Sequence, residues 1–182
     1  MFLAAIFSLL ISFLPGQFVP EEFVVSRGVD SFFSSSEIPQ EIFDVMKGKS
    51  YKDGCVIPRE SLRYLLCLHK DADGRTYVGE MVVAESIAGK VLHILKELYK
   101  ASYPIEKMRL VDYYDADAQK SMSANNSSAF NFRYISHSTK VSVHGLGLAV
   151  DINPKYNPYH KTLRDGRELV EPEGAEPYLD RN

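Results

Sequence analysis

Two strand-like runs joined by a short turn, followed directly by an amphipathic helix, constrain the fold of this chain most. Residues 62–69 are apolar and partly alternating, and residues 76–83 continue this pattern after the turn sequence Asp-Ala-Asp-Gly at 71–74. Between residues 86 and 102 apolar side chains recur at helical spacing, and Pro104 follows. Since helices and strands do not alternate regularly, the pattern favours a single α+β domain with an antiparallel sheet and flanking helices.

Weaker patterns predict further elements. Ser36 is expected to cap a short helix in which Ile38, Ile42, Val45 and Met46 form the apolar face. Three more strands are expected at residues 108–114, 130–135 and 146–152.

The N-terminal residues predict export. Residues 2–14 are apolar and carry no charge, and Pro15-Gly16 ends the run, which suits the hydrophobic region of a secretory signal peptide and is too short to span a bilayer. No basic residue precedes the run and no Ala-x-Ala follows it, so a buried N-terminal helix is the alternative. We expect a signal peptide at 1–17, a serine-rich lead-in or linker at 18–36 and the domain at 37–182.

Composition excludes several classes of protein. The 182 residues carry a formal net charge of −3, which argues against a general nucleic-acid binder. Two cysteines exclude a disulfide-dense scaffold and a four-cysteine zinc site. In an exported chain Cys55 and Cys67 could pair, whereas inside a cell they would be two small apolar residues.

The most informative motif contains His144 and Asp151. Gly145 and Gly147 allow the backbone to turn sharply after the histidine, and a strand over 148–152 would bring Asp151 back beside it. An imidazole and a carboxylate are suitable zinc ligands. On spacing alone, a turn histidine and a strand-end aspartate remain the simpler interpretation.

The pattern Ser142-x-His144-x-x-Gly147-x-Ala149-x-Asp151 resembles the zinc signature of the D-alanyl-D-alanine carboxypeptidase family, which includes VanY-like and L-alanyl-D-glutamate peptidases of bacterial cell walls. The resemblance extends over residues 51–55, 62–65, 103–107, 128–133, 151–154 and 156–159, within a region from about residue 46 to residue 182. It implies a fold like that of the Hedgehog and D-Ala-D-Ala peptidase domains.

The resemblance also implies roles for individual residues. His144 and Asp151 match two zinc ligands, and Arg133 matches an arginine that faces the substrate and stabilises charge on the scissile carbonyl. Ser128 is a second candidate for substrate contact, and Ser142 is expected to order the turn around His144. The implied substrate is a peptidoglycan stem peptide, cut with zinc as Lewis acid. Without the resemblance, Arg133 could be a surface or ion-pairing arginine.

One departure from the family pattern is important. The family takes a third zinc ligand, a histidine, from a C-terminal segment with an acidic general base shortly before it, and we expect both beyond Asn182, so that this chain lacks the segment. His137 and His160 do not match that pattern and are interpreted as polar loop residues. The alternative function is therefore a non-catalytic remnant of the same fold that binds cell-wall peptides.

Two acidic groups are given simpler interpretations. The sequence at 71–74 departs from a calcium-binding loop and is expected to be a hairpin turn. Asp112, Asp115 and Asp117 are expected to be a solvated group at a strand end.

Overall fold

An antiparallel hairpin forms the centre of the protein in the computed structural model, which describes residues 13–135 and 138–180. Strand β2 (Leu62–Lys70) pairs with β3 (Thr76–Ala84) along its whole length, from the pair Leu62 and Ala84 to the pair Lys70 and Thr76. In the turn, the carboxylate of Asp71 accepts hydrogen bonds from the backbone N–H groups of Asp73 and Arg75. The predicted hairpin is confirmed.

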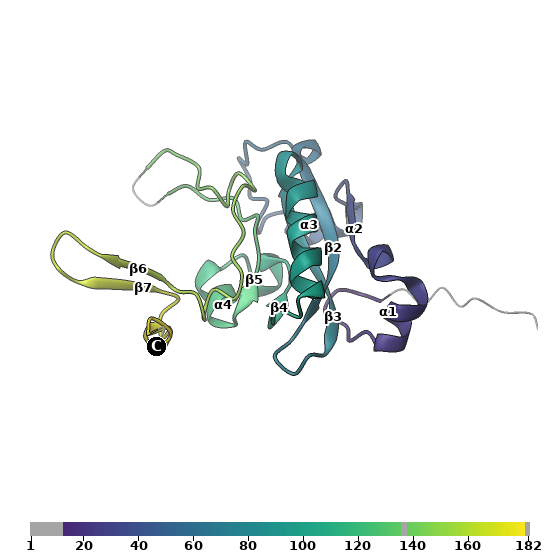
Figure 1. The fold of residues 1–182 in the computed structure, drawn as a ribbon. Coiled ribbons are helices and arrows are strands. Elements are labelled where there is room, and N and C mark those ends of the chain that lie inside the picture. Colours follow the sequence, from purple (N-terminus) through teal and green to yellow (C-terminus); the bar gives the residue numbers. More distant parts are fainter. Residues whose placement is uncertain (1–12, 136–137, 181–182) are drawn as a thin grey trace, which may run out of the picture.

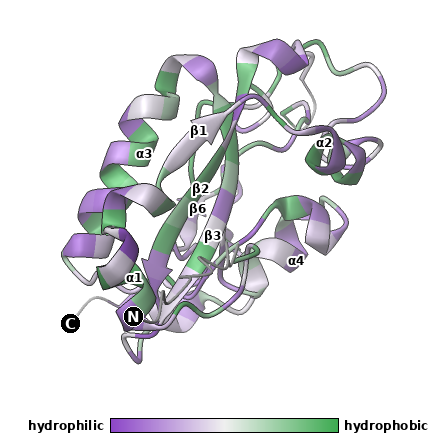
Figure 2. Cartoon of the chain, turned by 90° about the vertical axis from the view of Figure 1, so that its right-hand side faces the viewer, coloured by the Kyte–Doolittle hydropathy of each residue, from purple (hydrophilic) through white to green (hydrophobic). Residues whose placement is uncertain are grey.

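Helix α3 (Glu85–Lys100) follows β3 without a loop and covers one face of the sheet (Figures 1 and 2). Because side chains alternate across a strand, Leu65 and Cys67 of β2 face the helix together with Met81 and Val83 of β3. They form a buried cluster with α3 residues that include Leu95. The helix predicted from its periodicity is confirmed, although it ends at Lys100 rather than at residue 102.

The opposite face of the hairpin is also buried. Tyr64 and Val82 pack there with Met46 of helix α2 (Gln40–Met46) and with Phe130 and Phe132 from a later segment. Figure 2 shows the sheet between α3 on one side and α2 and helix α4 (Ala118–Ser123) on the other. The result is a mixed α+β domain with an antiparallel sheet and flanking helices, as predicted.

Residues 18–36 belong to this domain rather than to a linker. Helix α1 (Glu21–Arg27) and a 3₁₀ helix (Val29–Phe32) precede strand β1 (Ser34–Ser36), which pairs with β2 in the sheet order β1-β2-β3. The serines are compatible with an edge strand because its pairing uses backbone atoms, and all three are exposed. Of the predicted signal peptide, residues 1–12 lie outside the described residues.

Several predicted elements differ from the structure. Ser36 ends β1 and does not cap α2, whose N-cap is Pro39. The strand expected at 108–114 is reduced to β4 (Lys107–Met108), which pairs in parallel with β5 (Asn126–Ser127) and is followed by a 3₁₀ helix (Val111–Tyr114). Residues 130–135 and 146–152 form no regular strand, only single bridges between Tyr134 and Val141 and between Ser128 and Asp151.

The C-terminal elements are a hairpin and a short helical turn. Strands β6 (Tyr159–Thr162) and β7 (Glu168–Glu171) are antiparallel and extend to one side of the domain, and a 3₁₀ helix covers Glu176–Tyr178 (Figure 1). A further 3₁₀ helix covers Arg59–Ser61. Cys55 and Cys67 are both free thiols. Within the described part of the chain, no helix has the length and apolar character needed to cross a membrane.

Candidate metal centre

A glycine-bent turn carries His144. The hydroxyl oxygen of Ser142 accepts a hydrogen bond from the N–H of Gly145 at 2.9 Å, and the N–H of Leu146 donates to the carbonyl of Ser142 at 3.0 Å. Ser142 therefore orders the turn around His144, as expected. Gly147 completes the turn with a φ of +69°, a left-handed conformation that favours glycine.

The turn is attached to the end of the central hairpin. The N–H of Ala84, the last residue of β3, donates to the carbonyl of Gly147 at 2.9 Å. A Cβ added at Gly147 would lie 2.7 Å from the Ala84 nitrogen and 3.2 Å from Leu62 Cδ2, so no other residue fits without displacing the turn. The sheet thereby fixes the position of the segment that holds His144.

The turn also lies directly against the backbone of Arg133. The N–H of Ser142 donates to the Arg133 carbonyl at 2.9 Å, and a Cβ at Gly145 would lie only 3.0 Å from the same oxygen. Gly145 thus permits the close approach that brings His144 and Arg133 together.

The hydrogen bonds of His144 fix which ring nitrogen is free to bind a ligand. Its Nδ1 lies 2.9 Å from the carbonyl oxygen of Ala129. Since a carbonyl can only accept, Nδ1 carries the hydrogen, and in the neutral imidazole Nε2 then keeps its lone pair. A histidine that ligates a metal commonly donates its other ring N–H to such an acceptor, which orients the ring and sets its tautomer.

Asp151 is brought to His144 by a backbone bridge. Ser128 and Asp151 exchange two hydrogen bonds, of 3.2 and 2.9 Å. The bridge directs the Asp151 carboxylate towards the imidazole, and Oδ2 lies 3.4 Å from His144 Nε2. The predicted strand at 146–152 is absent, yet the two side chains that it was expected to bring together are adjacent.

The 3.4 Å between His144 Nε2 and Asp151 Oδ2 suits two ligands of one ion better than a direct hydrogen bond. It is longer than an ordinary N–H···O hydrogen bond, which spans about 2.7–3.2 Å. Two zinc ligands, each about 2.1 Å from the ion and separated by a tetrahedral angle of about 109°, have donor atoms about 3.4 Å apart. The pair therefore fits two corners of a shared tetrahedral ion. The side chains are 19% and 39% exposed, so solvent ions can reach the site.

A small cavity adjoins the pair. It has a volume of about 20 Å³, and its lining includes all four site residues predicted from the sequence, namely Ser128, Arg133, His144 and Asp151. The other lining residues are Val111, Ala118, Ser121, Met122, Ala129 and Asn131. Sequence reasoning missed Asn131, although it lies two positions before Arg133 and the residues on either side of it, Phe130 and Phe132, are apolar.

Two polar groups in the cavity wall lack partners. Among the described residues, the guanidinium of Arg133 forms no side-chain hydrogen bond or ion pair. Asn131 Oδ1 is buried and has no hydrogen-bond partner within the same ranges. The cavity thus presents a cation and a neutral acceptor beside the imidazole and carboxylate.

No third metal ligand joins the pair within residues 13–135 and 138–180, where no group of three His, Cys, Asp or Glu side chains could hold an ion. His160 is on β6, where its Nε2 lies 2.5 Å from Glu168 Oε2 on β7. His137 lies outside the described residues.

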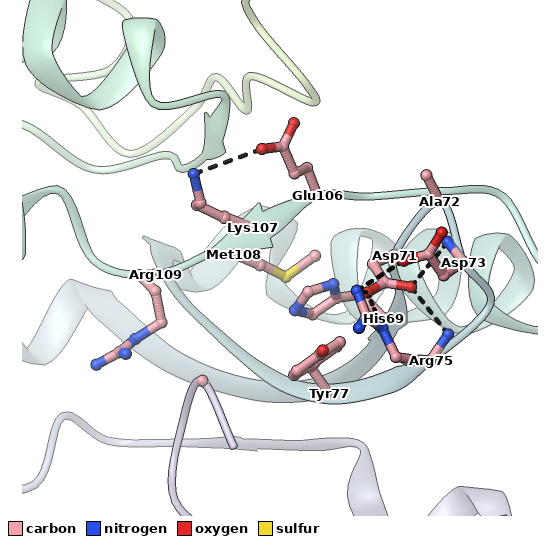
Figure 3. A pocket seen from close by; sticks show the side chains of 11 residues that line it. His69, Asp71, Ala72, Asp73, Arg75, Tyr77, Glu106, Lys107, Met108 and Arg109 are labelled. Atoms are coloured by element: carbon pink, nitrogen blue, oxygen red, sulfur yellow. Dashed lines mark hydrogen bonds and ion pairs between the residues drawn. The ribbon is translucent and has the colours of Figure 1, made fainter. Parts of the chain in front are cut away.

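A larger cavity, of about 390 Å³, lies between the β2–β3 turn and β4 (Figure 3). Its charged side chains are already paired: Arg75 contacts Asp71 and Asp73, and Lys107 contacts Glu106. The 71–74 segment is the hairpin turn expected from the sequence. Because each of these charges already has a partner of opposite sign, the cavity is a weaker candidate for an ion or a charged ligand than the smaller one.

The acidic group at 112–117 is only partly as predicted. Asp112 is buried rather than solvated, and its carboxylate accepts hydrogen bonds from the N–H and hydroxyl of Ser50 at 2.9 and 3.0 Å. Burial raises the pKa of Asp112 above its usual range. Asp115 is exposed, and Asp117 caps α4 by accepting from the N–H of Lys120. The three residues do not form a cation site.

Comparison with protein-family models, with curated proteins and with solved structures found no match to this chain. The resemblance to cell-wall carboxypeptidases therefore stays a prediction.

Proposed function

We propose that this protein is a zinc-dependent peptidase that acts on peptidoglycan stem peptides, of the D,D-carboxypeptidase or L-Ala-D-Glu endopeptidase type and with the corresponding fold. The observation that carries the proposal is the 3.4 Å distance between His144 Nε2, the ring nitrogen that does not face the Ala129 carbonyl, and Asp151 Oδ2. The substrate class comes from the resemblance of the 142–151 motif and its neighbouring segments.

The proposal gives each residue of the site a task. His144 and Asp151 hold the ion, and Ala129 keeps the imidazole in the tautomer that can bind it. Arg133 is free to hold a carbonyl or carboxylate oxygen of the peptide, and Ser128 is a second contact. When bound, zinc supplies Lewis acidity and lowers the pKa of a coordinated water towards neutrality.

A catalytic zinc site takes three protein ligands and an open position. The proposal therefore requires a third ligand, and an acidic general base, from outside the described residues. It also places the protein outside the cytoplasm, beside its substrate, as the uncharged apolar sequence at 2–14 predicts.

The test uses the full-length protein, supplied with zinc and incubated with a purified muropeptide. Release of D-alanine, or of stem-peptide fragments, is expected, and His144→Ala should abolish it. The matched control is His160→Ala, which removes the other histidine paired with an acid. If zinc is bound and no stem-peptide bond is cut, the peptidase proposal is wrong.

The second candidate is a binding protein without catalysis. It is favoured by the two-ligand set, since the described residues contain no third side chain for the ion. The same incubation separates the candidates, because a binding protein would bind the muropeptide and leave it uncut.

A further inference from the structure

We infer that Asn131 is a substrate-binding residue of this site, and that its side-chain oxygen accepts a hydrogen bond from a backbone N–H of the bound peptide. The inference rests on the proposed function and goes beyond it, because it assigns a residue outside the motif and states which part of a peptide that residue recognises.

The orientation of the Asn131 amide is fixed by its other partner. Nδ2 donates to the carbonyl oxygen of Ala116 at 3.0 Å. Rotating the amide by half a turn would place two oxygens against each other, so the end that lacks a partner is the acceptor.

Asn131 is 4% exposed, and Oδ1 is the only buried side-chain nitrogen or oxygen without a hydrogen-bond partner in the described part of the chain. An unpaired buried acceptor destabilises the folded protein, so such a group calls for an explanation. Asn131 lines the cavity beside His144 and Asp151, and a ligand in that cavity would supply the missing donor.

The backbone around Asn131 ties it to the rest of the site. Its N–H donates to the carbonyl of His144 at 3.2 Å. Phe130 and Phe132 are both 3% exposed and belong to the core, whereas Asn131 and Arg133 both line the cavity. Residues two apart in extended chain share a face and lie about 7 Å apart, so the acceptor and the guanidinium act on one ligand.

This pair of groups matches a peptide unit. A neutral oxygen suits the N–H of an amide, while the unpaired cation suits a carbonyl or carboxylate oxygen of the same ligand. A charged amine would be bound better by a carboxylate. The cavity, at about 20 Å³, has room for roughly one water or the edge of a peptide group, which limits what can reach Oδ1.

The inference is tested with a double-mutant cycle in the 182-residue chain, which should hydrolyse peptide slowly because its described residues supply two of the three ligands. Zinc-supplemented wild type and Asn131→Leu are titrated calorimetrically with N-acetyl-D-Ala-D-Ala and with the same peptide methylated on the nitrogen of its last amide. Asn131→Leu keeps the branched shape of the side chain and removes the acceptor, together with the donor to the Ala116 carbonyl. Comparing the same two peptides in both proteins cancels the steric effect of the methyl group.

We expect wild type to bind the N–H peptide about tenfold more tightly than the methylated one, as for the loss of one hydrogen bond at a buried acceptor. Asn131→Leu should reduce the preference to less than threefold. If Asn131→Leu does not fold, Asn131→Asp, which keeps an oxygen, takes its place and should retain the preference.

Equal binding of the two peptides by wild type, or an unchanged preference in Asn131→Leu, would show that Asn131 Oδ1 does not accept from the peptide N–H and would overturn the inference. Those outcomes leave the proposed function intact. Failure of wild type to bind either peptide would overturn the inference for a D-Ala-D-Ala ligand, while the proposed function is tested separately by the muropeptide incubation.

Discussion

Replacing Gly147 by alanine tests whether the His144 turn is held against the central hairpin. The added Cβ would meet the Ala84 nitrogen at 2.7 Å and the Val83 carbonyl carbon at 3.3 Å, both of them backbone atoms that cannot rotate away. The residue also has a φ of +69°, which alanine adopts only with strain.

The expected loss of stability has two parts. Left-handed backbone costs a non-glycine residue about 1–2 kcal/mol. Forcing an extra carbon into a packed site costs about 1–3 kcal/mol more. Gly147→Ala should therefore lower the free energy of unfolding by about 2–5 kcal/mol, which for a chain of this length corresponds to a fall in melting temperature of about 2–4 °C per kcal/mol.

Gly74→Ala is the matched control. Gly74 has a φ of +77° in the β2–β3 turn, but a Cβ there would have no neighbour within 4 Å. It should therefore lose only the conformational part, about 1–2 kcal/mol. Urea unfolding followed by circular dichroism measures both variants. Equal losses in the two would refute the contact between the His144 turn and β3.

Three further outcomes are expected. Arg133→Ala should change the free energy of unfolding by less than about 0.5 kcal/mol, because the guanidinium of Arg133 forms no hydrogen bond or ion pair among the described residues and its backbone contact with Ser142 is kept. The same variant should weaken peptide binding in calorimetry, and a large loss of stability would contradict this. Burial lowers the pKa of His69 below its usual 6.5, so the unfolded chain takes up a proton at a higher pH than the folded one. The free energy of unfolding should therefore fall as the pH drops below about 6.5. His69→Gln should flatten that decline in unfolding curves measured between pH 7 and 5. Asp117→Ala should cost about 0.5–2 kcal/mol in urea unfolding through loss of the α4 cap, and no change would show that the cap is unimportant.

The central hairpin and α3 could be predicted because their signals are local. Alternation at 62–69 and 76–83, the turn at 71–74 and the helical periodicity that follows are all visible in adjacent residues. The strands expected at 130–135 and 146–152 do not form, because apolar residues indicate that a segment is buried and not that its backbone pairs with another strand. Phe130 is buried, yet its N–H donates to Val82 without forming a ladder.

The proximity of His144 and Asp151 was predicted better than the elements around them. His144 and Asp151 lie together because a turn and one bridge suffice to join them. Asn131 was missed because its role depends on which atoms remain unpaired after folding, and no sequence pattern shows that. Residues 18–36 were expected to be a linker because serine content indicates exposure, whereas β1 uses its backbone to extend the sheet.

The central claim is that His144 and Asp151 bind one divalent ion. The most direct test is zinc affinity, measured in the 182-residue chain by competition with a chromophoric chelator, for wild type, His144→Ala and Asp151→Asn. His160→Ala is the control, since His160 Nε2 lies at direct hydrogen-bond distance from Glu168, at 2.5 Å, rather than at the wider spacing of two zinc ligands.

We expect weak binding of one zinc ion by wild type, because two protein ligands are fewer than a closed site provides. Loss of a residue that supports a metal ligand lowers metal affinity about 10–100-fold. Loss of a ligand itself, in His144→Ala or Asp151→Asn, should lower the zinc affinity at least as much, while His160→Ala should leave it within about twofold. Zinc affinity unchanged in His144→Ala, or lost equally in His160→Ala, would contradict the claim.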